Sequence, residues 1–289
     1  MLLYRPCYAL CNSFSDAEGR LVVAKFSLND ISFHVVCLYA PNRNPTRDVS
    51  FHFVSEHVDP GSPTVICGDF NAVFDTAPDR RGFPPAFFPR DSSRALISFF
   101  RECCVVDVWR HLHPHSSSFT WQTPDGSFSS RIDLVGCPLP WLHHVKACDI
   151  IPCPYSDHAA VLLVCPIPVP KPRGPGRWKF NASLLKDAAF VKEVENFWAY
   201  WTLRKPSSPL QSWWDKGKKR LKGIAIRFGT TCKAQHSDSR SLLSSLASHL
   251  KEQIDNGRVS LLGPYEGVLQ QISFLDKAEA EGARVHARV

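Results

Sequence analysis

The residues best able to do chemistry stand at the ends of short apolar segments. In PTVICGDFNAVFD, Pro63 to Asp75, an apolar run stops at a glycine, and Asp69 and Asn71 follow. Two more polar clusters, SSRID at Ser129 to Asp133 and YSDH at Tyr155 to His158, also border apolar runs. Taken alone, GDFN is typical of a turn, since Gly frees the backbone and Asp and Asn bond to it. Three clusters at predicted strand ends indicate one cleft.

Together these clusters contain the groups that phosphodiester hydrolysis needs. Carboxylates hold a divalent cation and polarise water, amide and guanidinium groups bind phosphate oxygens, and an imidazole carries charge or a proton. Asp157 and His158 are neighbours, so in a regular strand they would face opposite ways. We therefore expect them in a loop before Ala159, from which both side chains can point into the cleft.

Short strands in the first half of the chain must position these clusters. Runs rich in Val, Ile, Phe and Leu, bounded by Pro, Gly, Asn and Asp, predict strands. They lie at Ile31 to Tyr39, Thr64 to Cys67, Val105 to Trp109, Ser118 to Gln122, Ile132 to Gly136 and Ala159 to Val164, with a hairpin joining Ala9 to Phe14 and Leu21 to Phe26. Helical spacing predicts helices at Ser92 to Glu102 and around Phe51 to Val58.

The second half differs in charge and pattern. Residues 1–166 hold 13 Lys and Arg against 16 Asp and Glu, whereas residues 167–289 hold 21 against 11, a net charge of +10. The Pro-rich stretch 167–177 is predicted to be a linker. Beyond it, helical stripes pass through Phe190, Val194, Phe197 and Trp201, through Leu243, Leu246, Leu250 and Ile254, and through Val268, Ile272 and Leu275. We predict a basic helical segment over residues 178–289.

Composition limits the class of protein. The 289 residues are 44% hydrophobic, enough for a sizeable core, and the eleven cysteines form no CxxC pair. No run approaches the roughly 18 apolar residues of a membrane span. Arg5 and Pro6 stand where a signal peptide keeps its apolar core. We expect an intracellular protein with free thiols and no membrane partner.

Four motifs resemble one known superfamily. LYAPN at Leu38 to Asn42, GDFN at Gly68 to Asn71, SRID at Ser130 to Asp133 and SDH at Ser156 to His158 are similar, in order and spacing, to the endonuclease/exonuclease/phosphatase superfamily. Within it, FTW at Phe119 to Trp121 and the basic tail resemble the endonuclease region of LINE-type, non-LTR retrotransposon polyproteins. The resemblance implies an α/β fold, a two-sheet sandwich, over residues 1–166.

The resemblance also implies a role for each matching residue. Asp69 would activate the attacking water, and Asn71 would hold that water or a phosphate oxygen. Asp133 would orient His158, which stabilises or protonates the transition state, and Asp157 would help to hold Mg²⁺ or Mn²⁺. The substrate-binding residues would be Tyr39, Thr120, Arg131 and Ser156.

One family element has no counterpart in this sequence. Members carry an Asn and a metal-binding Glu on early strands, upstream of where this chain begins. Glu18 and Glu56 are the only glutamates before Asp69, and neither matches that ligand. We therefore expect a domain that lacks its first strands, binds metal weakly and nicks DNA poorly, and that precedes a missing reverse transcriptase.

Three functions stay open at this point. The first is an impaired, Mg²⁺-dependent endonuclease that nicks DNA for target-primed reverse transcription. The second is a non-catalytic remnant that binds nucleic acid, with DNA as the main partner and RNA as a second one through the basic segment. The third is a phosphatase or phosphodiesterase for small substrates. None of the three needs an organic cofactor.

Overall fold

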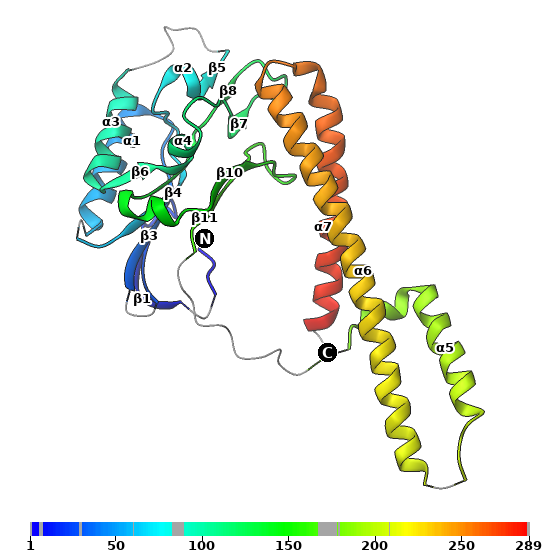
Figure 1. The fold of residues 1–289 in the computed structure, drawn as a ribbon. Helices are drawn as coiled ribbons and strands as arrows, with labels where there is room; N and C mark the ends of the chain where they lie inside the picture. Colours follow the sequence, from blue (N-terminus) through cyan, green and yellow to red (C-terminus); the bar gives the residue numbers. More distant parts are fainter. Residues whose placement is uncertain are drawn as a thin grey trace. The chain divides into compact units, whose positions relative to one another are not determined.

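The computed structural model describes residues 2–5, 8–28, 31–59, 61–82, 90–166, 178, 180–207 and 209–287. The chain divides into two compact units, drawn in Figure 1. One consists of Met1–Pro170 with Ser248–Tyr265, and the other of Lys171–Ala247 with Glu266–Val289. The predicted linker at 167–177 lies outside the described residues, and the predicted domain boundaries stay predictions.

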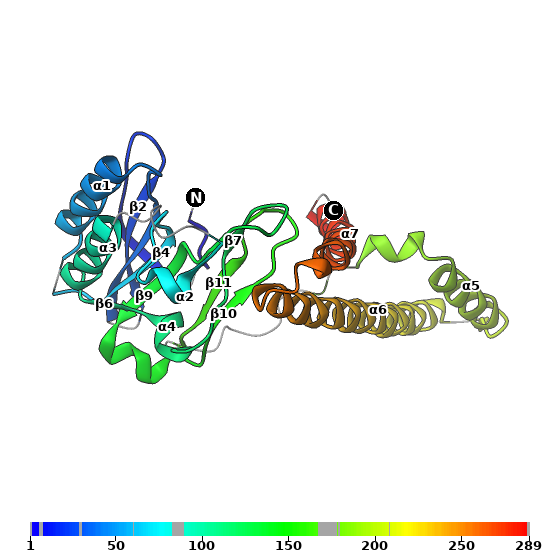
Figure 2. The same cartoon turned by 90° about the horizontal axis from the view of Figure 1, so that it is seen from above.

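A six-stranded sheet forms the centre of the first unit (Figure 2). In spatial order its strands are β1 (Ala9–Ser15), β2 (Leu21–Leu28), β3 (Ile31–Tyr39), β4 (Thr64–Asp69), β9 (Asp133–Pro138) and β6 (Val105–Asp107). Only β3 and β4 are parallel neighbours, and helix α1 (Asn44–His57) supplies the crossover that such a pair requires. The carboxyl ends of β3 and β4 therefore meet at one edge, where Tyr39 pairs with Asp69.

Helices α1 and α3 (Arg90–Glu102) cover one face of this sheet (Figure 1). Leu21 and Val23 of β2, with Val36 and Leu38 of β3, point towards the helices. Buried side chains of both layers form a single core: Leu21, Val23, Val36, Leu38, Phe51, Val54, Ile66, Phe70, Leu96, Phe99 and Phe100. The helix α3 stripe that spacing predicts, Leu96 with Phe99 and Phe100, contributes directly to this core. Residues on the other face of β2 and β3 are buried in a second cluster with Trp141 of the opposite layer: Ala24, Phe26, Leu28 and Phe33.

The opposite face of the sheet is covered by a second layer. A two-stranded sheet of β10 (Ala147–Ile151) and β11 (Ala160–Val164) lies there with helix α4 (Val108–Leu112) and the 3-10 helix η2 (Leu139–His144). A third sheet has the order β5 (Arg80–Arg81), β8 (Ser129–Ser130) and β7 (Trp121–Gln122), next to helix α2 (Thr76–Asp79). The predicted fold class, α/β sheets followed by helices, is confirmed.

Most predicted elements exist, and the differences have local causes. The strand predicted over Val105 to Trp109 ends at Asp107, because the Asp107 carboxylate caps α4 by accepting a hydrogen bond of 3.1 Å from the Arg110 N–H. The strand predicted over Ser118 to Gln122 covers only Trp121–Gln122. Strand β10 was not predicted. Its sequence, ACDII, has an Asp at the centre and gives a weak strand signal.

The second unit is helical. It contains η3 (Ala182–Lys186), α5 (Ala188–Thr202), most of α6 (Leu210–Asp255) and most of α7 (Leu262–Ala287); the turn between these two helices, with η4 (Val259–Leu261), belongs to the first unit. Phe190 and Leu184 pack with Ala225 and Phe228 in a small core, as the α5 stripe predicts. In the predicted α6 stripe, Ile254 is buried whereas Leu246 is 45% exposed. Among the described residues, every helix is too short or too polar to span a membrane.

Candidate active site

The order Gly, Asp, Phe, Asn at the end of β4 has a separate physical cause at each residue. Gly68 has a φ of +144°, and a Cβ there would lie 1.8 Å from the Leu38 carbonyl oxygen of β3. Only glycine allows this approach of the two parallel strands. Phe70 is fully buried in the core and anchors the turn. Asn71 adopts a φ of +47°, a left-handed conformation that Asn tolerates better than most residues.

Asn71 orients Asp69. Its backbone N–H donates a hydrogen bond of 2.9 Å to Asp69 Oδ1, and its Nδ2 donates one of 2.8 Å to the Ala40 carbonyl. The buried Arg47 of α1 donates to the Asn71 carbonyl at 2.6 Å. Asn71 Nδ2 also lies 3.4 Å from Asp69 Oδ2, so the Asn71 amide hydrogens face protein acceptors in this structure. The predicted contact of Asn71 with water or phosphate stays a prediction.

The three separated motifs meet at Asp69, Asp133 and His158. Asp69 and Asp133 are opposite each other in the β4–β9 register. His158 Nδ1 lies 2.8 Å from Asp133 Oδ2. One nitrogen or oxygen atom from each of the three side chains lies within 4.8 Å of the others. The structure thus brings GDFN, SRID and SDH together.

This proximity changes the protonation of two groups. Partial burial raises the pKa of Asp69 to about 6, and the negative charge of Asp133 adds to the rise, whereas the hydrogen bond from the Asn71 N–H opposes it. The hydrogen bond with Asp133 raises the pKa of His158, against the effect of burial. The raised pKa of Asp69 favours its use as a proton acceptor, and the raised pKa of His158 favours its protonated form.

Three more of the predicted site residues are exposed and lie around this centre. The Asp157 carboxylate accepts a hydrogen bond of 3.1 Å from Trp121 Nε1. The Ser156 hydroxyl accepts one of 3.0 Å from the His158 N–H, which shapes the SDH loop. Tyr39 is 54% exposed at the strand end beside Asp69. All three side chains are exposed and therefore accessible to a substrate.

Thr120 lies inside the protein, where we expected it to line the cleft. It is 1% exposed, and its hydroxyl accepts hydrogen bonds of 3.0 Å from the backbone N–H groups of Ile132 and Asp133. Its carbonyl accepts one of 2.6 Å from the Ala159 N–H. Thr120 therefore ties FTW to SRID and to the residue after SDH, and it positions the site without access to substrate.

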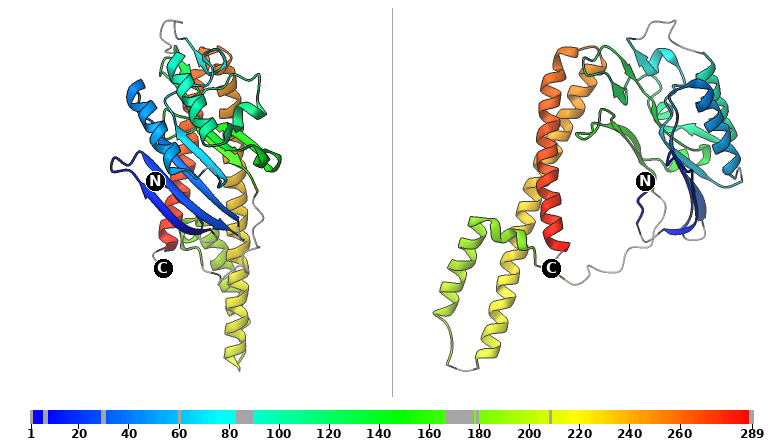
Figure 3. Two further views of the ribbon diagram at one scale, coloured as in Figure 1. Left: turned by 90° about the vertical axis from the view of Figure 1, so that its left-hand side faces the viewer. Right: turned by 180° about the vertical axis from the view of Figure 1, so that it is seen from behind.

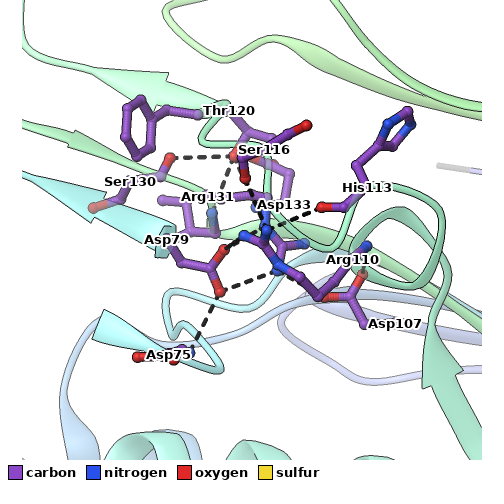
Figure 4. Close-up of polar contacts among 12 residues, drawn as sticks. Asp75, Asp79, Asp107, Arg110, His113, Ser116, Thr120, Ser130, Arg131 and Asp133 are labelled. Carbon is purple, nitrogen blue, oxygen red and sulfur yellow. Dashed lines mark hydrogen bonds and ion pairs between the residues drawn. The ribbon is translucent and has the colours of Figure 1, made fainter. Parts of the chain in front are cut away.

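Arg131 is also buried, and its ion pairs are drawn in Figure 4. Its Nε lies 2.7 Å from Asp79 Oδ1 and its Nη2 lies 2.7 Å from Asp107 Oδ2, with the side chain 1% exposed. Burial alone would lower the pKa of Arg131, but the two carboxylates raise it overall. This geometry does not support the predicted contact of Arg131 with substrate, because the guanidinium is shielded from solvent.

Sequence reasoning missed the partners that hold these groups. Asp79 is fully buried and also pairs with Arg110 at 2.5 Å, and Asp107 closes the network from the start of α4. A buried arginine requires carboxylate partners. Nothing in the local sequence identifies them, since Asp79 is 52 positions from Arg131. Trp121 could have been suspected because it precedes SRID in the FTW motif.

The group of Asp69, Asp133 and His158 can be tested as a metal site. It contains two carboxylates, and Mg²⁺ is commonly bound by one or two carboxylates together with waters and substrate phosphates. The donor set therefore fits a hard divalent cation. Within the described part of the chain this group includes no glutamate: Glu18 pairs with Arg20, and Glu56 lies near His52 on α1.

Comparison with known proteins agrees with this chemistry. The family model described as "Endonuclease/Exonuclease/phosphatase family" matches residues 2–201. The chain is 29% identical over 286 residues to the "Transposon TX1 uncharacterized 149 kDa protein" of Xenopus laevis, covering 95% of this chain and 21% of that protein. It therefore spans about a fifth of that relative.

Solved structures show lower similarity. An AP endonuclease from Archaeoglobus fulgidus matches with 22% identity and a TM-score of 0.42, over 52% of this chain and 66% of that one. The 3′ phosphatase NExo from Neisseria, bound to a product DNA hairpin, matches with 17% identity and a TM-score of 0.43, over 53% and 66%. With its family model matched over most of its length, the chain belongs to the endonuclease/exonuclease/phosphatase family.

Proposed function

We propose that this protein is a metal-dependent DNA endonuclease of retrotransposon origin, with impaired activity. The observation that carries the proposal is the Asp133–His158 pair, hydrogen-bonded at 2.8 Å beside Asp69. Nicking of DNA for target-primed reverse transcription is the use that the transposon relative suggests. The membership of a nuclease and phosphatase family supports the reaction class.

The chain's own residues supply proton transfer and positioning. Asp69, whose pKa is about 6, would take a proton from the attacking water. The hydrogen bond with Asp133 raises the pKa of His158, and the imidazole would stabilise the charge that develops on the phosphate or would protonate the leaving oxygen. The exposed Tyr39 would contact a phosphate oxygen of the DNA.

Asp69 and Asp133 would hold Mg²⁺ or Mn²⁺, with Asp157 nearby. When bound, the cation supplies polarisation of the phosphate and a lower pKa for coordinated water. The proposed impairment follows from the family resemblance, because the metal-binding Glu that it implies has no counterpart among the described residues of this group. We expect weak cation binding and slow nicking.

A plasmid assay tests this function. Supercoiled DNA is incubated with the full chain over a range of Mg²⁺ and Mn²⁺ concentrations, and with the variants Asp133→Asn and His158→Ala. We expect slow nicking that rises with cation concentration and is about 100-fold slower in both variants. His52→Ala, which removes an exposed histidine on α1, is the matched control and should keep the activity.

The alternatives give different results in the same experiment. DNA binding without nicking at any cation concentration would contradict the proposal and favour a non-catalytic remnant. Hydrolysis of a small phosphodiester such as bis(p-nitrophenyl) phosphate, with no nicking, would favour a small-substrate phosphodiesterase. Fast nicking at low Mg²⁺ would contradict the impairment and require another ligand.

We also propose that the basic segment 178–289 binds DNA, with RNA as a second candidate. Residues 178–289 hold 18 Lys and Arg against 11 Asp and Glu, a net charge of +7, and each phosphate neutralised by Lys or Arg releases counterions. Basic groups lie against aromatic rings in the second unit, with Arg204 4.0 Å from the Tyr200 ring centre and Lys218 5.9 Å from the Trp214 ring centre. Filter binding that falls steeply between low and moderate salt supports this role. Salt-independent binding contradicts it.

A further inference from the structure

The turn between the two longest helices packs inside the first unit. We call residues 248–265 the helical tip: it consists of the end of α6, η4 and the start of α7. Within that unit the tip lies beside the β5–β8–β7 sheet, as Figure 1 and Figure 3 both show. The sequence assigned these residues to the basic tail, yet their contacts are with the strands that flank the candidate active site.

Arg81 of β5 caps the carboxyl end of α6. Its Nη1 donates hydrogen bonds of 2.5 Å and 2.8 Å to the carbonyl oxygens of Ile254 and Asp255. A cation at this end of a helix also interacts favourably with the helix dipole. The same guanidinium donates to the Ser129 hydroxyl at 3.0 Å and lies 5.3 Å from the centre of the Phe119 ring. One side chain thus joins the tip to β8 and to FTW.

Asp255 makes a second connection from the tip to FTW. It is 6% exposed and forms an ion pair of 3.0 Å with the buried Lys251 one helical turn earlier. Its other oxygen accepts a hydrogen bond of 3.4 Å from the Phe119 N–H. A carboxylate buried in this way costs free energy unless it is paired, so the arrangement indicates a specific packed interface.

The β7–β8 turn makes apolar contacts with the tip. Gly126 has a φ of +68°, and a Cβ there would lie 3.0 Å from both Val259 Cγ1 and Leu262 Cδ1. Tyr265, at the start of α7, is 7% exposed. The tip is therefore fixed to the hairpin by apolar packing as well as by charge.

The segment that the helical tip contacts, Phe119 to Trp121, continues into the candidate active site. The residue after Phe119 is Thr120. Its hydroxyl accepts a hydrogen bond from the Asp133 N–H, and its carbonyl accepts one from the Ala159 N–H. The next residue, Trp121, donates a hydrogen bond to the Asp157 carboxylate and forms an isolated antiparallel β-bridge with His158. A shift of the segment Phe119 to Trp121 would therefore displace both members of the Asp133–His158 pair.

We propose that Arg81 and Asp255 are positioning residues, through which the helical tip holds the segment Phe119 to Trp121 and thereby the Asp133–His158 pair. This inference rests on the proposed endonuclease function only for its effect on rate. It gives the tail a role in the geometry of the active site, separate from any binding of nucleic acid.

Hydrogen exchange of the full-length chain tests the positioning without any need for catalysis. In Arg81→Ala and in Asp255→Asn we expect the backbone amides of Thr120, Asp133 and Ala159 to exchange at least about tenfold faster, while core amides of β2 and β3 keep their rates. The matched controls are Arg258→Ala and Glu252→Gln, exposed residues of the same tip. Unchanged exchange in both test variants, or the same change in the controls, would overturn the proposal.

Nicking kinetics supply the second measurement. We expect kcat to fall about tenfold or more in Arg81→Ala with KM nearly unchanged, because misplaced groups slow the chemical step. Arg81→Lys keeps the charge and a donor and should recover much of the rate. If Arg81→Ala does not fold, Asp255→Asn decides. If exchange is faster in the variants but the wild-type chain does not nick DNA, the positioning proposal stands and the nuclease proposal is refuted. If the variants change neither exchange nor kcat, the positioning proposal alone is refuted.

Discussion

Two charge clusters that begin two residues apart in SRID have opposite character. Arg131 and its partner Asp79 have side chains 1% exposed, with a contact of 2.7 Å. His158 and its partner Asp133 have side chains 27% and 19% exposed, with a contact of 2.8 Å. The distances are alike, so the clusters differ in access to solvent. Only the second can exchange protons or meet a substrate.

This difference in exposure suits the first cluster to stabilising the fold and the second to chemistry. A buried ion pair is locked, because losing one partner leaves an uncompensated charge away from water. A partly exposed pair costs less to alter, because solvent can compensate the charge that loses its partner. Substitutions in the first cluster should therefore act mainly on stability, and those in the second mainly on rate.

The largest effect should follow from Arg131→Met, which leaves Asp79 and Asp107 buried with one partner fewer. We expect the free energy of unfolding to fall by about 3–5 kcal/mol, measured by urea denaturation. Arg101→Met, on the exposed side of α3, is the matched control and should change stability by about 0.5 kcal/mol or less. A loss below about 1 kcal/mol for Arg131→Met would contradict the buried-network interpretation.

His158→Ala and Asp133→Asn should act on rate. We expect each to slow nicking about 100-fold, while the free energy of unfolding changes by about 1 kcal/mol or less. Because the two groups work as a pair, the double variant should also be slowed about 100-fold, and not by the product of the two effects. Single-turnover nicking rates check this. Multiplicative losses would show that the groups act independently.

Sequence reasoning located the second cluster and misread the first. The three motifs stand at strand ends, and the β4–β9 register places Asp69 opposite Asp133, so pattern and spacing were sufficient. Burial was not readable, because Arg131 has the same local signal as an exposed phosphate ligand. Its environment is set by Asp79 and Asp107, which only the folded chain brings near.

Long-range contacts explain the other structural features that the sequence did not predict. Arg81 meets the end of α6 across 173 positions, and no periodicity within either segment predicts that contact. The exposed Leu246 shows the same limit, since a helical stripe indicates a face but not what covers it. The turn propensity of GDFN could be read locally, but the need for glycine at position 68 comes from the Leu38 carbonyl of the neighbouring strand β3.

The pH dependence of stability should reveal Asp69. Its pKa in the fold is about 6, above its ordinary value of 3.8, so the folded state binds the proton more tightly than the unfolded state. Stability from this group is therefore present at low pH and is lost as pH rises from about 4 to about 6. After allowance for solvent screening, we expect about 2 kcal/mol or less.

Urea denaturation of the wild type and of Asp69→Asn at several pH values measures this loss. The difference between the two curves should flatten above about pH 6.5. Asp125→Asn, in the exposed β7–β8 turn, is a control whose difference from the wild type should show no loss over this range. A wild-type curve parallel to that of Asp69→Asn would show that the carboxylate has an ordinary pKa.

The smallest effect should come from Tyr39→Phe, at the open edge of the second cluster. The Tyr39 side chain is 54% exposed and forms no part of the buried core, so the substitution should leave the free energy of unfolding within about 0.5 kcal/mol of the wild type. If its hydroxyl donates to a phosphate oxygen, its loss removes about 1 kcal/mol of binding, which is about a fivefold weaker affinity for DNA. Filter binding at fixed salt measures this value. Tyr155→Phe, 59% exposed before the SDH motif, is the comparison, and an equal loss in both variants would place the effect in the general surface rather than in a contact at the β3 end.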